Sequence, residues 1–342
     1  MSWFRSIALM DVGRKARPTQ PIRRGSGFTP DTSTAPRGSG FMPDTLRRFL
    51  AVVATLFTAS LVNAAAPGPL LLDAALVGND IVAVGERGVI RRSTDDGQTW
   101  SPVTSGVPYT LCAISFADTR NGWAAGHGAV ILRTTDGGKI WAHQFTGPDP
   151  ESPFLDVLAL DHGHVIAVGA FGAFFESHDA GATWEQQWIL DDDVHLNRIT
   201  RTVGGTLFLA GEFGTLLRST DHGATWEHLS TGDDGSLYGV IELANDSLLA
   251  YGLRGRVYRS TDHGDNWTAL KTPGTGLIMT GIELASARTV ILAGQARTWW
   301  MSHDHGATFV AAGDVTPAIA EVLLTPHGKL LTFGEDGAQV AP

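Results

Sequence analysis

The sequence predicts an all-β protein, a seven-bladed β-propeller of four-stranded antiparallel blades. Three observations lead to this prediction. An octet recurs at steps of 41 to 43 residues, a glycine-ended apolar run precedes five of the six octets, and no stretch keeps a helical period of 3.6 over 11 residues. Four short strands in a repeat of ~40–45 residues are typical of a propeller blade, which must pack between neighbours to bury both faces.

The octet is clearest in two adjacent copies, STDHGATW at 219–226 and STDHGDNW at 260–267. Related octets begin at residues 93, 134, 177 and 302, and all six keep an aspartate, a glycine and a closing aromatic residue. We interpret these three positions as structural. They are Asp95, Gly97, Trp100, Asp136, Gly138, Trp141, Asp179, Gly181, Trp184, Asp221, Gly223, Trp226, Asp262, Gly264, Trp267, Asp304, Gly306 and Phe309.

Each octet is predicted to be the turn between the third and fourth strands of a blade. The aspartate can accept hydrogen bonds from backbone N–H groups two or more residues on, and the glycine permits a positive φ. The aromatic residue packs back as an apolar anchor. No catalytic role is predicted for the octets. Their histidines are expected to face solvent as turn residues: His178, His222, His263, His303 and His305.

A second signature, such as IAVGAFG or FLAGEFG, lies just upstream of each octet and predicts the second strand and a tight turn. In the sixth unit Arg297 takes the place of the final glycine. A seventh copy, LTFGEDG at 331–337, has no octet after it. Blade seven is therefore expected to have three strands, or to close with a very short outer strand.

The first part of the chain is predicted to be no part of the propeller. Residues 42–65 read as a signal peptide, with two arginines, a 14-residue apolar stretch from Phe49 to Val62, and cleavage after Ala64 or Ala65. Residues 1–41 contain a 13-residue duplication and are predicted to be disordered, with Met42 as the true start. Whether residues 1–41 are translated stays open. The propeller is assigned to residues 66–342, exported to the periplasm or secreted.

Composition excludes several classes of protein. Cys112 is the single cysteine, so no intramolecular disulfide forms. Residues 67–342 hold 16 of the 25 Lys and Arg and 32 of the 35 Asp and Glu, a formal net charge of −16 that disfavours nucleic acid. No cofactor or metal is predicted. An acidic group could hold Ca²⁺ but lacks EF-hand spacing, so a solvated loop is favoured: Asp191, Asp192, Asp193, Asp233 and Asp234.

The octets resemble the Asp box, or BNR repeat. Together with the upstream signature at this spacing, residues 68–342 resemble the family of photosystem II assembly and stability factors and their non-photosynthetic relatives. The resemblance implies a non-catalytic propeller delivered across a membrane, acting as a scaffold in membrane-protein assembly. It also implies a basic element on the strand before the octet, matched in four units by Arg91, Arg92, Arg133, Arg218 and Arg259, and replaced by Glu176 and Met301 in the third and sixth. The client and any photosynthetic role stay open.

Binding is expected on the rim opposite the octets, where the segments between blades vary in sequence. The expected partner is a membrane-associated protein bound by a monomer, with no small-molecule substrate. Candidate contact residues lie in the turns between strands two and three and in one segment between blades: Arg87, Phe171, Trp188, Phe213, Arg254 and Arg297.

The alternative function is a sialidase-like glycan-binding protein or glycoside hydrolase, because Asp boxes occur in sialidases. That chemistry uses a tyrosine nucleophile partnered by a glutamate, and the tyrosines available are Tyr109, Tyr238, Tyr251 and Tyr258. The seven units also differ by only a few residues in length, whereas an enzyme site tends to break repeat symmetry with insertions. The sequence therefore favours the scaffold.

Overall fold

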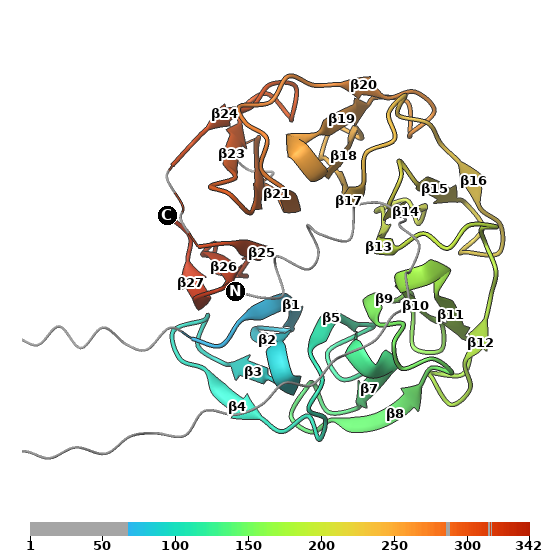
Figure 1. Cartoon of the computed structure of the whole chain (residues 1–342). Coiled ribbons are helices and arrows are strands. Elements are labelled where there is room, and N and C mark those ends of the chain that lie inside the picture. The colour runs from blue at the N-terminus through green and yellow to red at the C-terminus, as the bar shows by residue number, and fades with distance from the viewer. Residues whose placement is uncertain (1–67, 285–287, 314, 316) are drawn as a thin grey trace, which may run out of the picture. The chain divides into compact units, whose positions relative to one another are not determined.

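The computed structural model describes residues 68–342 except 285–287, 314 and 316, and these residues form seven antiparallel sheets arranged in a ring (Figure 1). Each sheet is one blade, and its strands follow one another in chain order. The first strand of each blade contacts the first strand of the next, and β1 contacts β25, so the ring closes. The extension 1–41 and the signal peptide 42–65 lie outside the described residues.

Strand bounds follow the repeat. The first four blades are β1 (Leu71–Val77), β2 (Asp80–Gly85), β3 (Ile90–Ser93) and β4 (Ser101–Val103); β5 (Leu111–Phe116), β6 (Gly122–Gly126), β7 (Val130–Thr134) and β8 (Ala142–Thr146); β9 (Phe154–Ala159), β10 (Val165–Gly169), β11 (Phe174–Ser177) and β12 (Glu185–Gln186); β13 (Leu196–Arg201), β14 (Leu207–Gly211), β15 (Leu216–Ser219) and β16 (Glu227–His228).

The remaining blades are β17 (Leu237–Glu242), β18 (Leu248–Gly252), β19 (Val257–Ser260) and β20 (Thr268–Ala269); β21 (Ile278–Leu284), β22 (Thr289–Gly294), β23 (Trp299–Ser302) and β24 (Val310–Ala311); β25 (Ile319–Leu324), β26 (Leu330–Gly334) and β27 (Gly337–Val340). In four blades a 3₁₀ turn joins the second and third strands: η1 (Glu86–Gly88), η2 (His127–Ala129), η3 (Ala170–Gly172) and η4 (Leu253–Gly255). No helix in the described part of the chain is long and apolar enough to cross a membrane.

Blade seven has three strands within the described residues, as the missing octet predicted. The chain enters the ring beside its third strand: a Cβ on Gly68 would lie 3.1 Å from the Asp336 carbonyl oxygen. The beginning and the end of the propeller are therefore packed side by side, between blade one and blade seven.

The hydrophobic core is divided among the contacts between blades. Seven clusters of buried residues occur, and each combines side chains of two adjacent blades. The second strand of blade four, β14, is buried from Leu207 to Gly211. One of its faces packs on blade three and the other on blade five. Burial of a Leu or Phe side chain contributes about 1.5–3 kcal/mol, so these interfaces supply most of the stabilisation.

The octets lie between the third and fourth strands of six blades, as predicted. In blade four the Ser219 hydroxyl donates to Asp221 Oδ1 at 2.8 Å and accepts the Gly223 N–H at 2.8 Å. Asp221 also accepts the Thr225 N–H at 2.9 Å, and the bonds from Thr225 and Ser219 lower the pKa of Asp221 to about 2. The octet glycines all have positive φ, from 72° to 96°. The serine and the aspartate of this turn thus satisfy one another and the backbone N–H groups of Gly223 and Thr225.

The closing aromatic residues are buried or half-buried, as predicted. Among the octet histidines the prediction of solvent exposure is right for His178, His222, His263 and His303 and wrong for His305. His305 is half-buried because its Nδ1 lies 3.1 Å from Glu283 Oε1, a carboxylate on the first strand of the same blade.

Replacing Ser219 by alanine should lower the free energy of unfolding by about 1–3 kcal/mol, because the buried N–H of Gly223 loses its acceptor. Urea denaturation measures the change. The exposed neighbour Thr220→Ala is the matched control and should have little effect. Equal stability of the Ser219 variant and the wild type would contradict this account of the turn.

Candidate functional site

The rim opposite the octets, here called the turn rim, carries large side chains in the strained turns between second and third strands. Phe171 and Phe213 have φ of 55° and 53°, and Arg87 and Arg254 have 51° and 58°. Left-handed backbone is uncommon for residues other than glycine and costs of order 1 kcal/mol or more, so it persists where the surroundings enforce it. Phe171 is 51% and Phe213 63% exposed. The tight turn between the second and third strands therefore holds an aromatic side chain out into solvent in blades three and four.

Arg297 departs from this arrangement. It occupies the glycine position of the sixth turn and has φ of 63°, while Ala296 before it has φ of 53°. In the sixth turn both successive left-handed residues thus carry a side chain, whereas in blades one to five one of the two is a glycine.

Phe171 and Trp188 come together at a hollow of about 270 Å³ between blades two and three. Trp188 is 72% exposed, although it lies in the segment that links blades three and four. The buried rings of Phe154 and Phe175 line the same hollow, and they contact each other edge to face at 5.4 Å. Pro148 from the preceding linker completes one wall. An apolar hollow with exposed aromatic sides suits an inserted apolar side chain.

The two phenylalanine turns are connected through a polar pair. The Phe171 ring lies 4.9 Å from the His195 ring, and His195 Nδ1 lies 2.7 Å from Glu212 Oε2. Glu212 directly precedes Phe213. Burial raises the pKa of Glu212, but the hydrogen bonds and charge of His195 outweigh it and leave the pKa below its usual value. Blades three and four therefore hold their exposed aromatic residues in a fixed relation.

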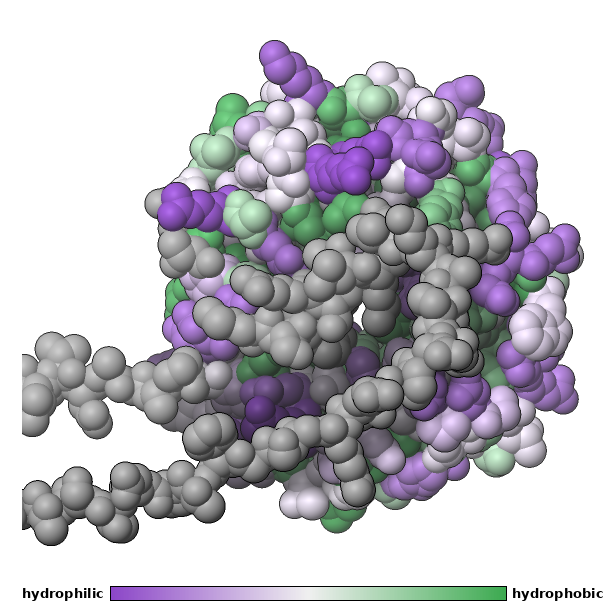
Figure 2. All heavy atoms as spheres, in the orientation of Figure 1, coloured by the Kyte–Doolittle hydropathy of each residue, from purple (hydrophilic) through white to green (hydrophobic). Residues whose placement is uncertain are grey.

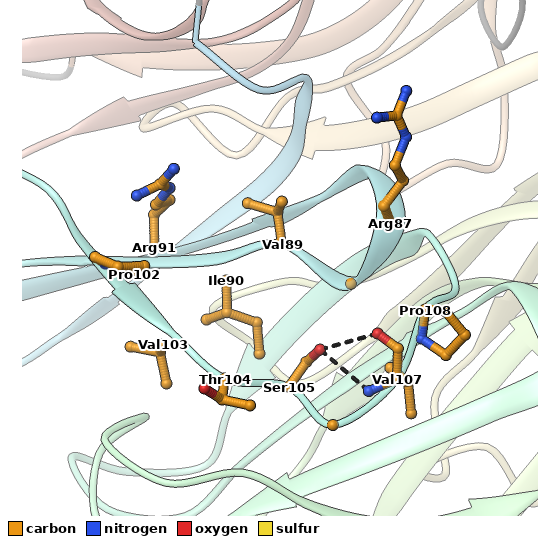
Figure 3. Close-up of a pocket in the computed structure, with 12 residues that line it drawn as sticks. Arg87, Val89, Ile90, Arg91, Pro102, Val103, Thr104, Ser105, Val107 and Pro108 are labelled. Atoms are coloured by element: carbon orange, nitrogen blue, oxygen red, sulfur yellow. Dashed lines mark hydrogen bonds between the residues drawn. The ribbon is translucent and has the colours of Figure 1, made fainter.

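A second hollow on this rim, of about 560 Å³, lies in blade one (Figure 3). Ile90, Val103 and Val107 are among its lining residues, and the Ser105 hydroxyl bonds to the Val107 N–H and carbonyl. Arg87 and Arg91 extend away from the Ser105–Val107 segment (Figure 3). The arginine turn of this blade thus borders an apolar depression. On the side of the ring seen in Figure 2, hydrophilic side chains are spread around the outer edge with apolar groups between them.

The structure therefore separates the six predicted contact residues. Phe171 and Trp188 share one hollow, Arg87 borders another, and Phe213, Arg254 and Arg297 are exposed on neighbouring turns. Of the acidic group, Asp191, Asp192 and Asp193 are exposed, while Asp233 pairs with Arg256 at 3.1 Å. Tyr109 was not predicted as a contact residue. It is 45% exposed and packs over the Gly128 turn of blade two.

A charged ring at the axis was also missed from the sequence. Every first strand carries an irregularity in its pairing, and in four blades the residue after it is charged. These charged residues are Asp73, Asp156, Arg198 and Glu321. The signal was a charged residue inside an apolar run at one repeat position, as in LLDAALV, FLDVLA and IAEVLL.

The carboxylates of this ring connect neighbouring blades. Asp73 accepts the Ile114 N–H of blade two, and Asp156 accepts the Ile199 N–H of blade four, each at 2.8 Å. Glu321 accepts the Thr280 hydroxyl of blade six at 2.7 Å. Arg198 reaches from blade four to Glu321 at 2.9 Å. The ring is thus a structural network that ties blades together at the axis.

Burial controls the protonation of this network. Burial, with a smaller contribution from Glu321, raises the pKa of Asp73 to about 8. Burial also raises the pKa of Asp156 to about 6, against the opposing effect of Arg198. Near neutral pH, Asp73 therefore keeps its proton.

Comparison with known proteins identifies the chain. The profile of the family described as Photosynthesis system II assembly factor YCF48 matches residues 68–146 and 148–283, more than half of the sequence. The chain belongs to this family. No curated protein matches the chain significantly.

Solved structures share the fold. One described as YCF48 bound to D1 peptide is 21% identical with a TM-score of 0.66, and the match covers 81% of this chain and 95% of that one. YCF48 from Cyanidioschyzon merolae is 17% identical with a TM-score of 0.66, covering 80% and 95%. The GH74 xyloglucanase from Xanthomonas campestris is 13% identical with a TM-score of 0.63, covering 80% and 52%. At these identities the likeness is one of fold.

Four of the five strand arginines implied by the resemblance have partners within the protein. Arg92 pairs with Asp80, and the Arg259 guanidinium donates to the Ser247 hydroxyl at 2.9 Å. Arg218 bridges to Asp265 of blade five at 2.6 Å. Arg133 lies over the Trp123 ring, 5.6 Å from its centre. These side chains are therefore engaged on blade faces, one in each blade.

The tyrosines considered for a glycosidase lie in different surroundings. Tyr251 and Tyr258 are 1% and 4% exposed. The Tyr251 hydroxyl bonds to Arg198 beside the axis, and burial raises the pKa of Tyr251 to about 12. Tyr238 is half-buried on β17. Tyr251 thus belongs to the network at the axis.

The free energy of unfolding should fall as pH rises from about 5 to about 8.5. Folded Asp73 and Asp156 have pKa values of about 8 and about 6, above the ordinary 3.8, so the folded protein binds more protons in this window. Stability from these groups is complete below pH 3.8 and lost as pH passes the folded values.

Urea denaturation at several pH values tests this linkage. Asp73→Asn should make the fall shallower, because asparagine has no proton to release. Asp191→Asn, at an exposed position, should leave the slope unchanged. The same slope in the Asp73 variant and the wild type would rule out Asp73 as the source.

Proposed function

We propose that this propeller is a non-catalytic scaffold that binds an extended, apolar-containing segment of a membrane or envelope protein while that protein is assembled. The observation that carries the proposal is the set of exposed aromatic side chains on the turn rim of blades two to four, Tyr109, Phe171, Trp188 and Phe213. Aromatic residues dominate the energetic centres of protein interfaces, and strained exposed ones call for a functional reason.

Shape and chemistry agree with a segment rather than a small molecule. The hollow at Phe171 and Trp188 has room for one or two side chains, and further contacts would spread to Phe213 in the next blade. Family membership supports the same reading, and one structural relative is described as bound to a D1 peptide. Here the client is any membrane protein segment of suitable chemistry, bound by a monomeric propeller.

The charge balance favours the same class of partner. With a formal net charge of −16 beyond residue 66, the surface repels polyanions. The turn rim carries both signs of charge, since Arg87 and Arg254 are exposed in its turns and Asp191–Asp193 are exposed in a segment between blades. A client segment that combines apolar and polar side chains can contact both the aromatic and the charged residues of this rim.

Photocrosslinking from Trp188 should capture the client. A photoreactive phenylalanine analogue replaces Trp188, which is 72% exposed, and a matched variant replaces Ile140 on the octet rim, which is 71% exposed. With membranes of the source organism, we expect one integral membrane protein to be labelled from position 188 and not from position 140.

Two further measurements sharpen this test. Phe171→Ala should weaken capture from position 188 at least tenfold, since it removes one side of the hollow. Equal labelling from both rims would contradict the proposed binding surface. Hydrolysis of sialosides or xyloglucan by the purified protein would contradict a non-catalytic role.

Export is part of this proposal. The arginine pair, apolar stretch and small residues of 42–65 support delivery across a membrane. Amino-terminal sequencing of the protein from cell fractions should give Ala65 or Ala66 as the first residue, in the periplasm or medium. A mature protein that retains residues 46–62 would contradict cleavage.

A further inference from the structure

Blade three breaks the repeat at the octet rim. The residue before the octet is an arginine in four of the six octet-bearing blades, and in blade three it is Glu176. The second octet residue is threonine in four blades and His178 here. His164 directly precedes β10. The corresponding residue of blade one is Asp80, which pairs with Arg92. Where blade one has an ion pair, blade three therefore has two imidazoles and a carboxylate.

Strand pairing places all three side chains on one face of the blade. Glu176 is paired with Ile166 and Ser177 with Val165, so His164 and His178 are the next opposed positions. Residues two apart on a strand share a face, which puts Glu176 beside His178. The His164 and His178 rings are 4.4 Å apart between centroids.

The potential ligand atoms already converge. His164 Nε2 lies 2.5 Å and His178 Nε2 lies 3.5 Å from the same carboxylate oxygen, Glu176 Oε1. One nitrogen or oxygen atom from each of the three residues lies within 4.8 Å of the others. Bond lengths of about 2.0–2.2 Å in a tetrahedral site put ligand atoms roughly 3.3 Å apart, so small side-chain rotations would open the centre for an ion.

The backbone under these residues is fixed. The Ala180 N–H of the octet donates to the Gly163 carbonyl at 2.8 Å, joining the two turns that carry the histidines. The His164 N–H is held by Asp161 Oδ1 at 2.8 Å. Blade four covers one side, since a Cβ on Gly223 would lie 3.8 Å from Glu176 Oε1. The geometry is therefore set before any ion arrives.

Burial and exposure divide the cluster as a metal site requires. The side chains of His164 and Glu176 are 15% and 11% exposed, and that of His178 is 68% exposed. A largely buried carboxylate needs a positive partner, and in the described part of the chain the ion-pair partners of Glu176 are His164 and His178. Two imidazoles and one carboxylate suit Zn²⁺ and its neighbours in the first transition row, with a remaining position for water on the solvent side.

We propose that His164, Glu176 and His178 bind one divalent transition-metal ion, for which Zn²⁺ is the expected occupant. The ion bridges the turn before β10 and the third strand of the same blade. It replaces the ion pair used in blade one and leaves one coordination position facing water.

Equilibrium dialysis of the full chain with Zn²⁺, using protein without a histidine tag, tests the site. We expect one ion per chain, with affinity reduced more than roughly tenfold in His164→Asn, Glu176→Gln and His178→Asn, since even residues that only orient ligands change affinity 10- to 100-fold. His303→Asn is the matched control, because His303 holds the same octet position in blade six. It should bind like the wild type.

Co²⁺ gives an independent readout. Visible absorption of the Co²⁺-loaded chain should show the bands of a low-coordinate nitrogen and oxygen site, and these should vanish in Glu176→Gln. Circular dichroism and the metal-free unfolding midpoint confirm that each variant is folded. Absence of stoichiometric binding, or equal loss in the His303 and His178 variants, would overturn the proposal and leave a His–Glu ion pair.

Discussion

The packing of each blade against two neighbours is the constraint on which the rest of this structure depends. The core is divided into seven clusters, and each one belongs to a contact between blades. No blade can bury its faces alone, so the repeat must continue until the ring closes between β1 and β25. The octet turns and the carboxylates at the axis act within that frame. The octet turns make hydrogen bonds within each outer hairpin. The carboxylates at the axis bond to the first strands of neighbouring blades.

Both proposed binding sites lie where this symmetry is relaxed. On the turn rim, blades one to six share one left-handed backbone position, and it carries arginine, glycine, phenylalanine or alanine without changing the fold. Blades three and four use that freedom for exposed phenylalanines, and blade three adds the hollow at Trp188. At the octet rim the same blade exchanges arginine for Glu176 and gains two histidines. Membership of the YCF48 family accounts for the propeller, whereas these departures belong to single blades of it.

Much of the fold could be predicted from the sequence, because the repeat writes the same local requirement six times. A single hairpin requires a positive φ at Gly223 and a serine hydroxyl beside Asp221, so both features can be predicted from the octet alone. The absence of an octet after residue 337 likewise predicted the three-stranded seventh blade. His305 was placed wrongly because its partner, Glu283, is 22 residues away on the first strand of its blade.

By itself, then, the sequence determined the blades, their number, the corner turns and the rim on which Phe171 and Phe213 are exposed, since all of these follow from contacts within one repeat. Only the tertiary structure decided which residues of different repeats meet. Arg198 and Glu321 are 123 residues apart and bond at 2.9 Å, and the arginines of the third strands prove to be engaged within the blades rather than gathered in one patch. Such contacts depend on ring curvature and on the pairing irregularity of each first strand, which no local pattern encodes.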